Sequence, residues 1–252
     1  MDNDEKGEAP TMIKINAKQL CLKIFIPTIA FSLLYLLIGS FSSIPQLLLF
    51  CILGTAVLIP MEIAILLNAS KKEIGSYSFK ITMFGQEQLP AWKILLISLI
   101  FSAWAGLLSA FVSPIENEVF GTMRDSLLSF LPTGFDWTDY GYLKSFPKPM
   151  LIITCVYYGI FNVLIAPITE ELYFRGYLTS HYQKQSVVTP ILITILFSLY
   201  HFWLPFNNLF RILAFLPIAI ISYRKKNLLI SICFHCICNL FSTIGFTLAV
   251  LG

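Results

Sequence analysis

The sequence predicts an all-α membrane protein, a polytopic bundle of about seven transmembrane helices. Of its 252 residues, 57% are hydrophobic and 12% are charged, whereas about a quarter of the residues of soluble proteins are charged. A helix that crosses a bilayer needs roughly 20 apolar residues. Apolar runs of about this length recur from Leu20 to the C-terminus. Because these runs are continuous rather than alternating, they favour helices over the strands of a closed barrel.

Seven hydrophobic segments account for most of the chain, and no internal repeat or low-complexity tract interrupts them. They cover approximately residues 21–40, 44–67, 91–112, 150–169, 187–204, 209–223 and 228–251. We expect three parts: a polar cytosolic tail (1–18), N-terminal spans and loops (19–149), and a C-terminal transmembrane domain (150–252).

The distribution of basic residues predicts the orientation, because cytosolic loops are enriched in Lys and Arg. With the tail in the cytosol, twelve basic residues lie on the cytosolic side and four on the other. The twelve are Lys6, Lys14, Lys18, Lys71, Lys72, Lys80, Lys93, Arg175, Lys184, Arg224, Lys225 and Lys226, and the four are Arg124, Lys144, Lys148 and Arg211. We expect a multi-pass protein of a bacterial or archaeal cell membrane.

Two regions are harder to interpret. Residues 113–149 read as an extracytoplasmic loop with a short helix near 123–131. The twelve residues between Arg211 and Arg224 would make about 18 Å of helix, whereas the hydrocarbon core is about 30 Å thick. Either Arg211 extends to the membrane surface, or the fifth and sixth helices form a partly re-entrant pair that lines a cavity.

Composition also excludes some functions. The net charge of +3 is small and spread over loops, so a nucleic-acid partner has no support. Five of the six cysteines lie inside apolar runs, where we expect free thiols that behave as small hydrophobic side chains.

Polar side chains within the apolar segments mark the candidate site, because such groups are costly in a bilayer and face a bundle interior. Glu171 and Arg175 are spaced i,i+4, in the favourable order for an ion pair. Glu170 is rotated by about 100° from Glu171. One carboxylate therefore lacks a local cation, which makes it a candidate general base.

His201 ends the fifth segment, and His235 and Asn239 share one face of the seventh. Glu170 and His201 lie at similar distances, about 22–24 Å, from the predicted turn near Gln185, so they should face each other. The third histidine, His181, falls in a polar loop and has no expected role. Glu62 could be a further buried carboxylate, although neighbouring Pro60 favours a kinked helix end. Arg211 stays undecided.

The spacing Glu170-Glu171-x-x-x-Arg175, Phe197-x-x-x-His201 and His235-x-x-x-Asn239 resembles the three motifs of the CPBP family of intramembrane proteases. This family comprises CAAX-protease and bacteriocin-processing (Rce1-like, Abi) proteins, and the resemblance covers about residues 150–245. It implies an active site within the membrane, formed by the C-terminal helices, and an endopeptidase acting on membrane-associated peptides or proteins. Substrates would be prenylated-CAAX-like or of the bacteriocin or leader type.

The resemblance also implies roles for the residues. Glu170 and His201 would activate a water, Glu171 and Arg175 would hold the local geometry, and His235 and Asn239 would stabilise the oxyanion. No cofactor is certain. Glu170, His201 and His235 are suitable ligands for Zn²⁺, but the His-Glu-x-x-His signature is absent, so a metal-independent mechanism and a zinc-assisted one both stay open.

Two other functions remain as alternatives. One is a non-proteolytic immunity protein against peptide toxins, which the resemblance also implies. The other is a proton-coupled transporter, since buried carboxylates and histidines also form proton relays; the absence of an inverted repeat disfavours it. The expected partners are the lipid bilayer and a membrane-associated substrate, and the sequence does not indicate an oligomeric state.

Overall fold

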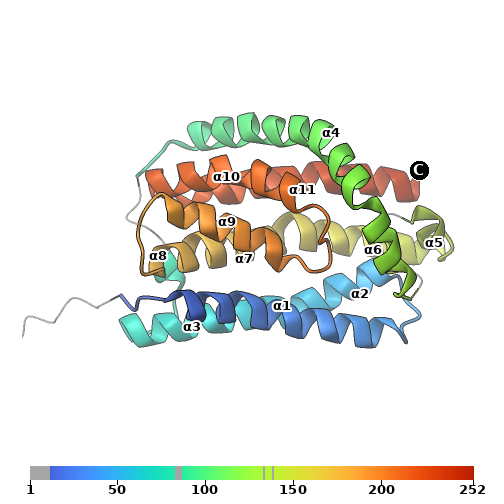
Figure 1. Ribbon diagram of the computed structural model, residues 1–252, viewed down its shortest axis with the longest axis horizontal. Helices are drawn as coiled ribbons and strands as arrows, with labels where there is room; N and C mark the ends of the chain where they lie inside the picture. The colour runs from blue at the N-terminus through green and yellow to red at the C-terminus, as the bar shows by residue number, and fades with distance from the viewer. Residues whose placement is uncertain (1–11, 83–86, 133, 138) are drawn as a thin grey trace, which may run out of the picture.

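The computed structural model describes residues 12–82, 87–132, 134–137 and 139–252, and these form a bundle of helices (Figure 1). Within these ranges the structure contains no β-strand, and a single bridge joins Ile15 to Tyr182. The predicted all-α fold is confirmed. Residues 1–11 of the predicted tail lie outside the described residues, and helix α1 begins at Ala17.

Five helical spans among the described residues are long and apolar enough to cross a membrane. They are α1 (Ala17–Gly39), Gln46–Ile74, α4 (Ala91–Ser129), Lys148–His181 and α11 (Leu228–Leu251). The other two predicted segments form the shorter helices α9 (Val188–Tyr200) and α10 (Asn208–Lys225). All seven predicted segments are thus helical; α9 is shorter than its predicted range, 187–204, whereas α10 is slightly longer than its predicted range, 209–223.

The short helix α9 favours the re-entrant pair that was one of the two sequence-based alternatives, and this arrangement in the membrane stays a prediction. The 13 residues of α9 extend only about 20 Å, which is less than the hydrocarbon thickness. Their connecting turn ends well short of the C-terminal end of α11 (Figure 1). Arg211 is 8% exposed, so it does not extend to an outer surface.

Two prolines give the second and fourth spans their irregular turns. Pro60 and Pro167 each follow a π-helical segment, Gly54–Leu58 and Phe161–Ile165. Since proline has no backbone N–H, the helix cannot continue its regular ladder there. The two segments also touch: a Cβ added to Gly54 would lie 2.5 Å from the ring of Phe161. Glycine thus allows the two spans to approach closely.

The prediction of a loop over residues 113–149 is wrong for its first half. Helix α4 continues through Pro114 to Ser129, and the short helix lies at α5 (Tyr140–Lys144) instead of 123–131. One proline removes one hydrogen bond and bends a helix without ending it when the following residues can resume the ladder. Figure 1 shows the second half of α4 turned away from its first half.

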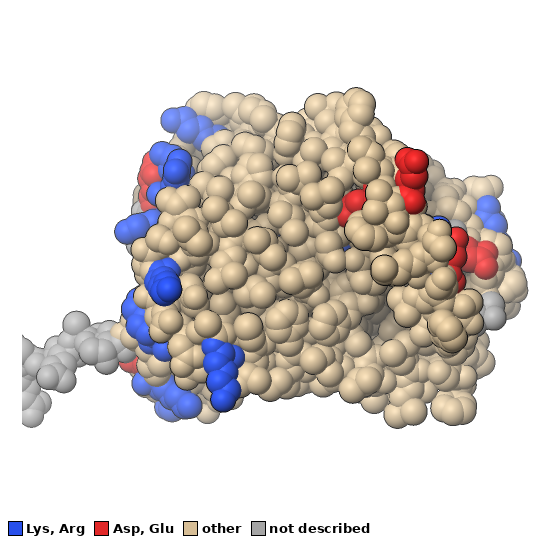
Figure 2. All heavy atoms as spheres, in the orientation of Figure 1, with Lys and Arg blue, Asp and Glu red and all other residues tan. Residues whose placement is uncertain are grey.

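Charged side chains gather at opposite ends of the bundle (Figure 2). Most of the visible Lys and Arg lie at the end at which α1 begins and α10 finishes, whereas most of the visible Asp and Glu lie towards the other end. This asymmetry agrees with the sequence-based topology. The assignment of the basic end to the cytosol stays a prediction.

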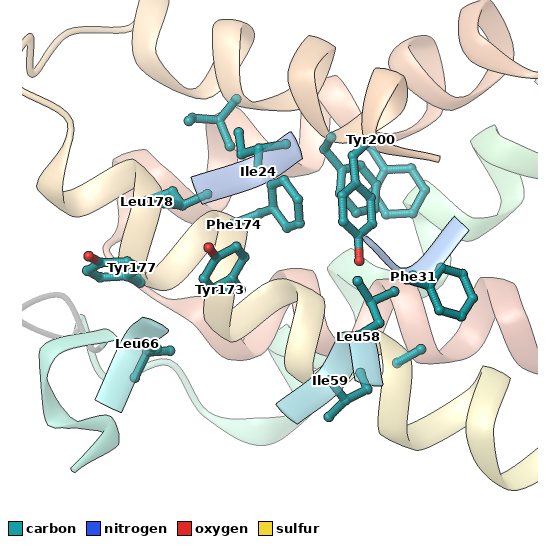
Figure 3. Close-up of a cluster of buried hydrophobic side chains, with 14 of the residues drawn as sticks. Ile24, Phe31, Leu58, Ile59, Leu66, Tyr173, Phe174, Tyr177, Leu178 and Tyr200 are labelled. Atoms are coloured by element: carbon teal, nitrogen blue, oxygen red, sulfur yellow. The ribbon is translucent and has the colours of Figure 1, made fainter. Parts of the chain in front are cut away.

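One hydrophobic core joins the N-terminal spans to the segments that follow residue 150. Ile24 and Phe31 of α1 and Leu66 of α3 (Ile59–Ile74) belong to the same cluster as Phe174 and Tyr200, which Figure 3 shows. On another side of the bundle, α4 packs against both α10 and α11. The transmembrane part before residue 150 and the part after it therefore share one core. This packing does not test the predicted boundaries at residues 18 and 149.

Candidate active site

Glu171 lies on the enclosed side of the fourth span. It begins the π-helical segment Glu171–Leu178 and is fully buried. Its Oε1 lies 3.3 Å from Nη1 of Arg175 and accepts a hydrogen bond from His235 Nδ1 at 3.0 Å. The ion pair expected from the i,i+4 spacing is therefore confirmed, and the carboxylate also fixes one histidine.

Arg175 is held by aromatic rings as well as by Glu171. Its guanidinium carbon lies 4.0 Å from the ring centre of Phe197 and 5.2 Å from that of Phe215. Cation–π contacts of this kind are strongest where water is excluded, and Arg175 is only 3% exposed. This side of the helix is densely packed, which leaves little space for a substrate.

Glu170 ends helix α7 (Ala166–Glu170) and turns towards a cavity. Its Oε2 lies 3.8 Å from His235 Nε2, which is too long for a direct hydrogen bond. Adjacent helical residues differ by about 100° in direction, so the two neighbouring glutamates face different surroundings, as the sequence indicated.

Both histidines of the motifs have one ring nitrogen engaged. His201 Nδ1 donates to the carbonyl oxygen of Phe197 at 2.7 Å, and His235 Nδ1 donates to Glu171. In a neutral imidazole, a proton on Nδ1 leaves Nε2 as an acceptor. Each ring therefore keeps its Nε2 available for a ligand, a water or Glu170.

Asn239 is positioned by an irregularity in the fourth span. The N–H of Ala166 bonds to Phe161, and Pro167 has no N–H, so the carbonyl of Asn162 has no helical donor. Asn239 Nδ2 donates to this oxygen at 2.8 Å. Nδ2 also lies 3.4 Å from Asn162 Oδ1, a long contact that another acceptor could replace, since an amide nitrogen carries two hydrogens.

A cavity of about 580 Å³ collects four of the six predicted residues, a volume within the usual range for small-molecule sites. Glu170, His201, His235 and Asn239 line it, whereas Glu171 and Arg175 do not. Its other walls include side chains that precede residue 150, to which sequence analysis assigned no role in the site. Among these are Phe50, Ser102, Ala105 and Trp137.

Two buried charged residues near this cavity were not assigned from the sequence. Arg211 lines the cavity. Glu62 is fully buried and accepts a hydrogen bond from the Tyr200 hydroxyl at 2.6 Å, so it is a buried carboxylate as well as the neighbour of a helix irregularity. The signal in the sequence was a charged residue within or beside an apolar segment, because charged side chains are costly in a bilayer.

The interpretation of His181 as a loop residue is wrong. The fourth span continues to His181, which is 1% exposed and lies 3.0 Å from Glu73 Oε1. The chain near Ile15 covers it, since the N–H of Ile15 donates to the His181 carbonyl. Neither His181 nor Glu73 lines the cavity described above.

The predicted zinc ligands are not gathered into a metal site. Within the described ranges, no group of three or more His, Cys, Asp or Glu side chains is arranged to hold a metal ion. The bonded Nδ1 of each histidine does not itself argue against a metal, because metal-ligating histidines usually donate their other ring N–H to a carbonyl or carboxylate. Because the three side chains do not form such a group among the described residues, no step below is routed through a metal.

Comparison with protein families gives one match. Residues 152–241 match the family model described as type II CAAX prenyl endopeptidase Rce1-like. The match contains all three motifs and is consistent with the CPBP resemblance; this family implies intramembrane endopeptidase activity. Among curated proteins and solved structures, none matches this chain.

Proposed function

Because residues 152–241 form an Rce1-like domain, we propose that this chain cleaves membrane-associated peptides or proteins with a water activated by Glu170. The observation that supports this most is the cavity, which holds Glu170, His201, His235 and Asn239 together. The substrates we expect are prenylated-CAAX-like or of the bacteriocin or leader type.

In this proposal, Glu170 and His201 act on the water. Glu170 accepts a proton from it while the Nε2 of His201 accepts its other hydrogen as a hydrogen bond, and the water oxygen attacks the carbonyl carbon of the scissile bond. The proton then passes from Glu170 to the amide nitrogen as the carbon–nitrogen bond breaks. General acid–base catalysis of this kind contributes about 10²–10⁴-fold.

His235 and Asn239 stabilise the negative oxygen of the tetrahedral intermediate. Asn239 keeps its hydrogen bond to the Asn162 carbonyl and turns its second Nδ2 hydrogen from the long contact with Asn162 Oδ1 to the oxyanion. Donation by His235 Nε2 requires a proton on that nitrogen in addition to the one on Nδ1. The Glu171 carboxylate, 3.0 Å from Nδ1, stabilises the resulting imidazolium, and Arg175 keeps Glu171 in place.

The direct test is cleavage of a membrane-associated peptide library, read by mass spectrometry, with purified wild type and Glu170→Gln in lipid nanodiscs. We expect the variant to lose about 10²–10⁴-fold in rate because it lacks the general base. Glu73→Gln is the matched control, since Glu73 is also buried against a histidine but lies outside the cavity. Equal cleavage by wild type and Glu170→Gln would refute the proposal.

A further inference from the structure

The cavity wall contains a second buried arginine whose hydrogen-bonding groups are only partly used. Arg211 is 8% exposed and lines the cavity together with Glu170. Its Nη1 donates to the Ser198 carbonyl at 3.2 Å and approaches Ser198 Oγ and Asn208 Oδ1 at 3.4 Å. In the part of the chain that the structure describes, Nε and Nη2 have no hydrogen-bond partner.

The charge of Arg211 is also less well compensated than that of Arg175. Arg175 lies 3.3 Å from a carboxylate oxygen, whereas Arg211 forms no ion pair within 4 Å among the described residues. Glu170 and Glu116 are the carboxylates whose charges act on it at longer range. Both oxygens of Glu116 accept backbone N–H groups, from Leu209 at 2.7 Å and from Phe210 at 3.1 Å.

A buried charge is costly unless it is paired and hydrogen-bonded. In a guanidinium, Nε and one terminal nitrogen form an edge that matches the two oxygens of a carboxylate, and such bidentate pairs are strong and specific. Because this edge has no hydrogen-bond partner among the described residues and Arg211 lines the cavity, the missing anion is expected from a ligand rather than from the protein.

We propose that Arg211 binds a carboxylate of the peptide substrate and thereby selects substrates that carry one close to the scissile bond. The carboxylate is either a free C-terminus or an Asp or Glu side chain. An extended residue spans about 3.3–3.6 Å, so within a cavity of this size the carboxylate lies only a few residues from the bond. This inference rests on the proposed function, because it assigns a specificity residue to the same site.

The test uses one peptide cleaved in the library screen, resynthesised in three forms: C-terminal acid, C-terminal amide, and amide with Glu as the last residue. For wild type we expect kcat/KM to be about 10–100-fold higher for the acid than for the amide, since hydrogen bonds to charged groups are typically worth about 1.5–3 kcal/mol. If the amide that ends in Glu is cleaved as fast as the acid, a side-chain carboxylate can replace the C-terminal one. If it is cleaved as slowly as the plain amide, Arg211 recognises the C-terminal carboxylate itself.

Arg211→Gln should reduce the acid-to-amide ratio of kcat/KM to about one, since only the acid form uses the charge. Arg211→Lys keeps the charge but lacks the planar edge, so it should retain only part of the preference. Arg124→Gln, at an exposed arginine, should change neither rate. Equal loss on acid and amide would overturn the inference and assign Arg211 to structure or to the charge of Glu170.

A binding measurement separates this inference from the proposed function. The Glu170→Gln variant in nanodiscs is titrated with the acid and amide forms of the same peptide. If no peptide is cleaved, a library peptide that binds the wild-type protein is used instead. Acid-selective binding that depends on Arg211 supports the inference even if no peptide is cleaved. Equal binding of both forms contradicts it, whatever the outcome of the cleavage assay.

Discussion

The two faces of the helix that carries Glu170 and Glu171 differ in the burial of their carboxylates and in the partners that these carboxylates contact. On the cavity face, the Glu170 side chain is 8% exposed and its nearest charged partner is 3.8 Å away. On the packed face, Glu171 is fully buried and touches both Arg175 and His235. A rotation of about 100° between neighbours thus separates a carboxylate that can react from one that is already committed.

The packed face also shows what a buried ion pair does here. Desolvation offsets much of the attraction between such charges, so a buried pair is weak evidence for stability. Its consequence in this structure is orientation, because Glu171 holds the ring of His235 with Nε2 towards Glu170. The cavity face depends on the packed face for geometry, and the predictions below separate the two contributions.

The largest effect is expected from His201→Ala on the cavity face. Loss of the Nε2 acceptor should reduce kcat by about 10²–10⁴-fold, the usual contribution of a positioned acid–base group, with little change in thermal unfolding. His181→Ala is the matched control, since this buried histidine touches Glu73 outside the cavity. It should leave kcat unchanged, and a similar loss in both variants would contradict the assignment.

On the packed face, Arg175→Met should lower the free energy of unfolding by about 3–5 kcal/mol, because it leaves the Glu171 charge buried without its cation. The double variant Arg175→Met/Glu171→Gln should recover part of this loss, since no unpaired charge then remains. Chemical unfolding in detergent micelles measures both. Strictly additive losses would show that the two side chains are not energetically coupled.

Asn239→Ala should reduce kcat by about 10²–10³-fold, the range measured when one oxyanion donor is removed elsewhere, and should change KM little. Thr243→Val is the control, because the Thr243 hydroxyl accepts from Asn162 Nδ2 at 3.0 Å and so also links α11 to Asn162. If Thr243→Val lowers kcat as strongly, then Asn239 acts by holding Asn162 in place.

The smallest effect is expected from metal removal. Since Glu170, His201 and His235 do not form a metal-binding group among the described residues, a chelator such as EDTA should leave the cleavage rate within about twofold of its initial value. Metal analysis of the same sample gives the bound content. Loss of activity on chelation and recovery on addition of Zn²⁺ would favour the zinc-assisted mechanism instead.

Local spacing explains why much of the site was predictable from the sequence. Glu171 and Arg175 are paired by helical periodicity alone, and the spacing of Arg211 and Arg224 already raised a re-entrant pair as one of two alternatives. Apolar run length likewise predicted the membrane spans. In each case the interaction or the length is contained in a short stretch of chain.

The features that the sequence did not reveal depend on partners far away along the chain. Glu62 is bonded to Tyr200, 138 positions later, and His181 is buried only because Glu73 and the segment around Ile15 cover it. The use of one edge of Arg211 depends on how α9 meets α10. Such tertiary contacts override local signals, as the passage of α4 through Pro114 also illustrates.

The measurement that tests the account most directly compares Glu170→Gln with Glu171→Gln in one preparation, following both single-turnover cleavage and the unfolding free energy. Glu170→Gln should abolish most cleavage and leave unfolding within about 1 kcal/mol of wild type, whereas Glu171→Gln should cost about 3–5 kcal/mol because it leaves Arg175 buried without its anion. If Glu170→Gln retains cleavage, or if it destabilises the fold as much as Glu171→Gln does, the division between a reactive face and a packed face is wrong.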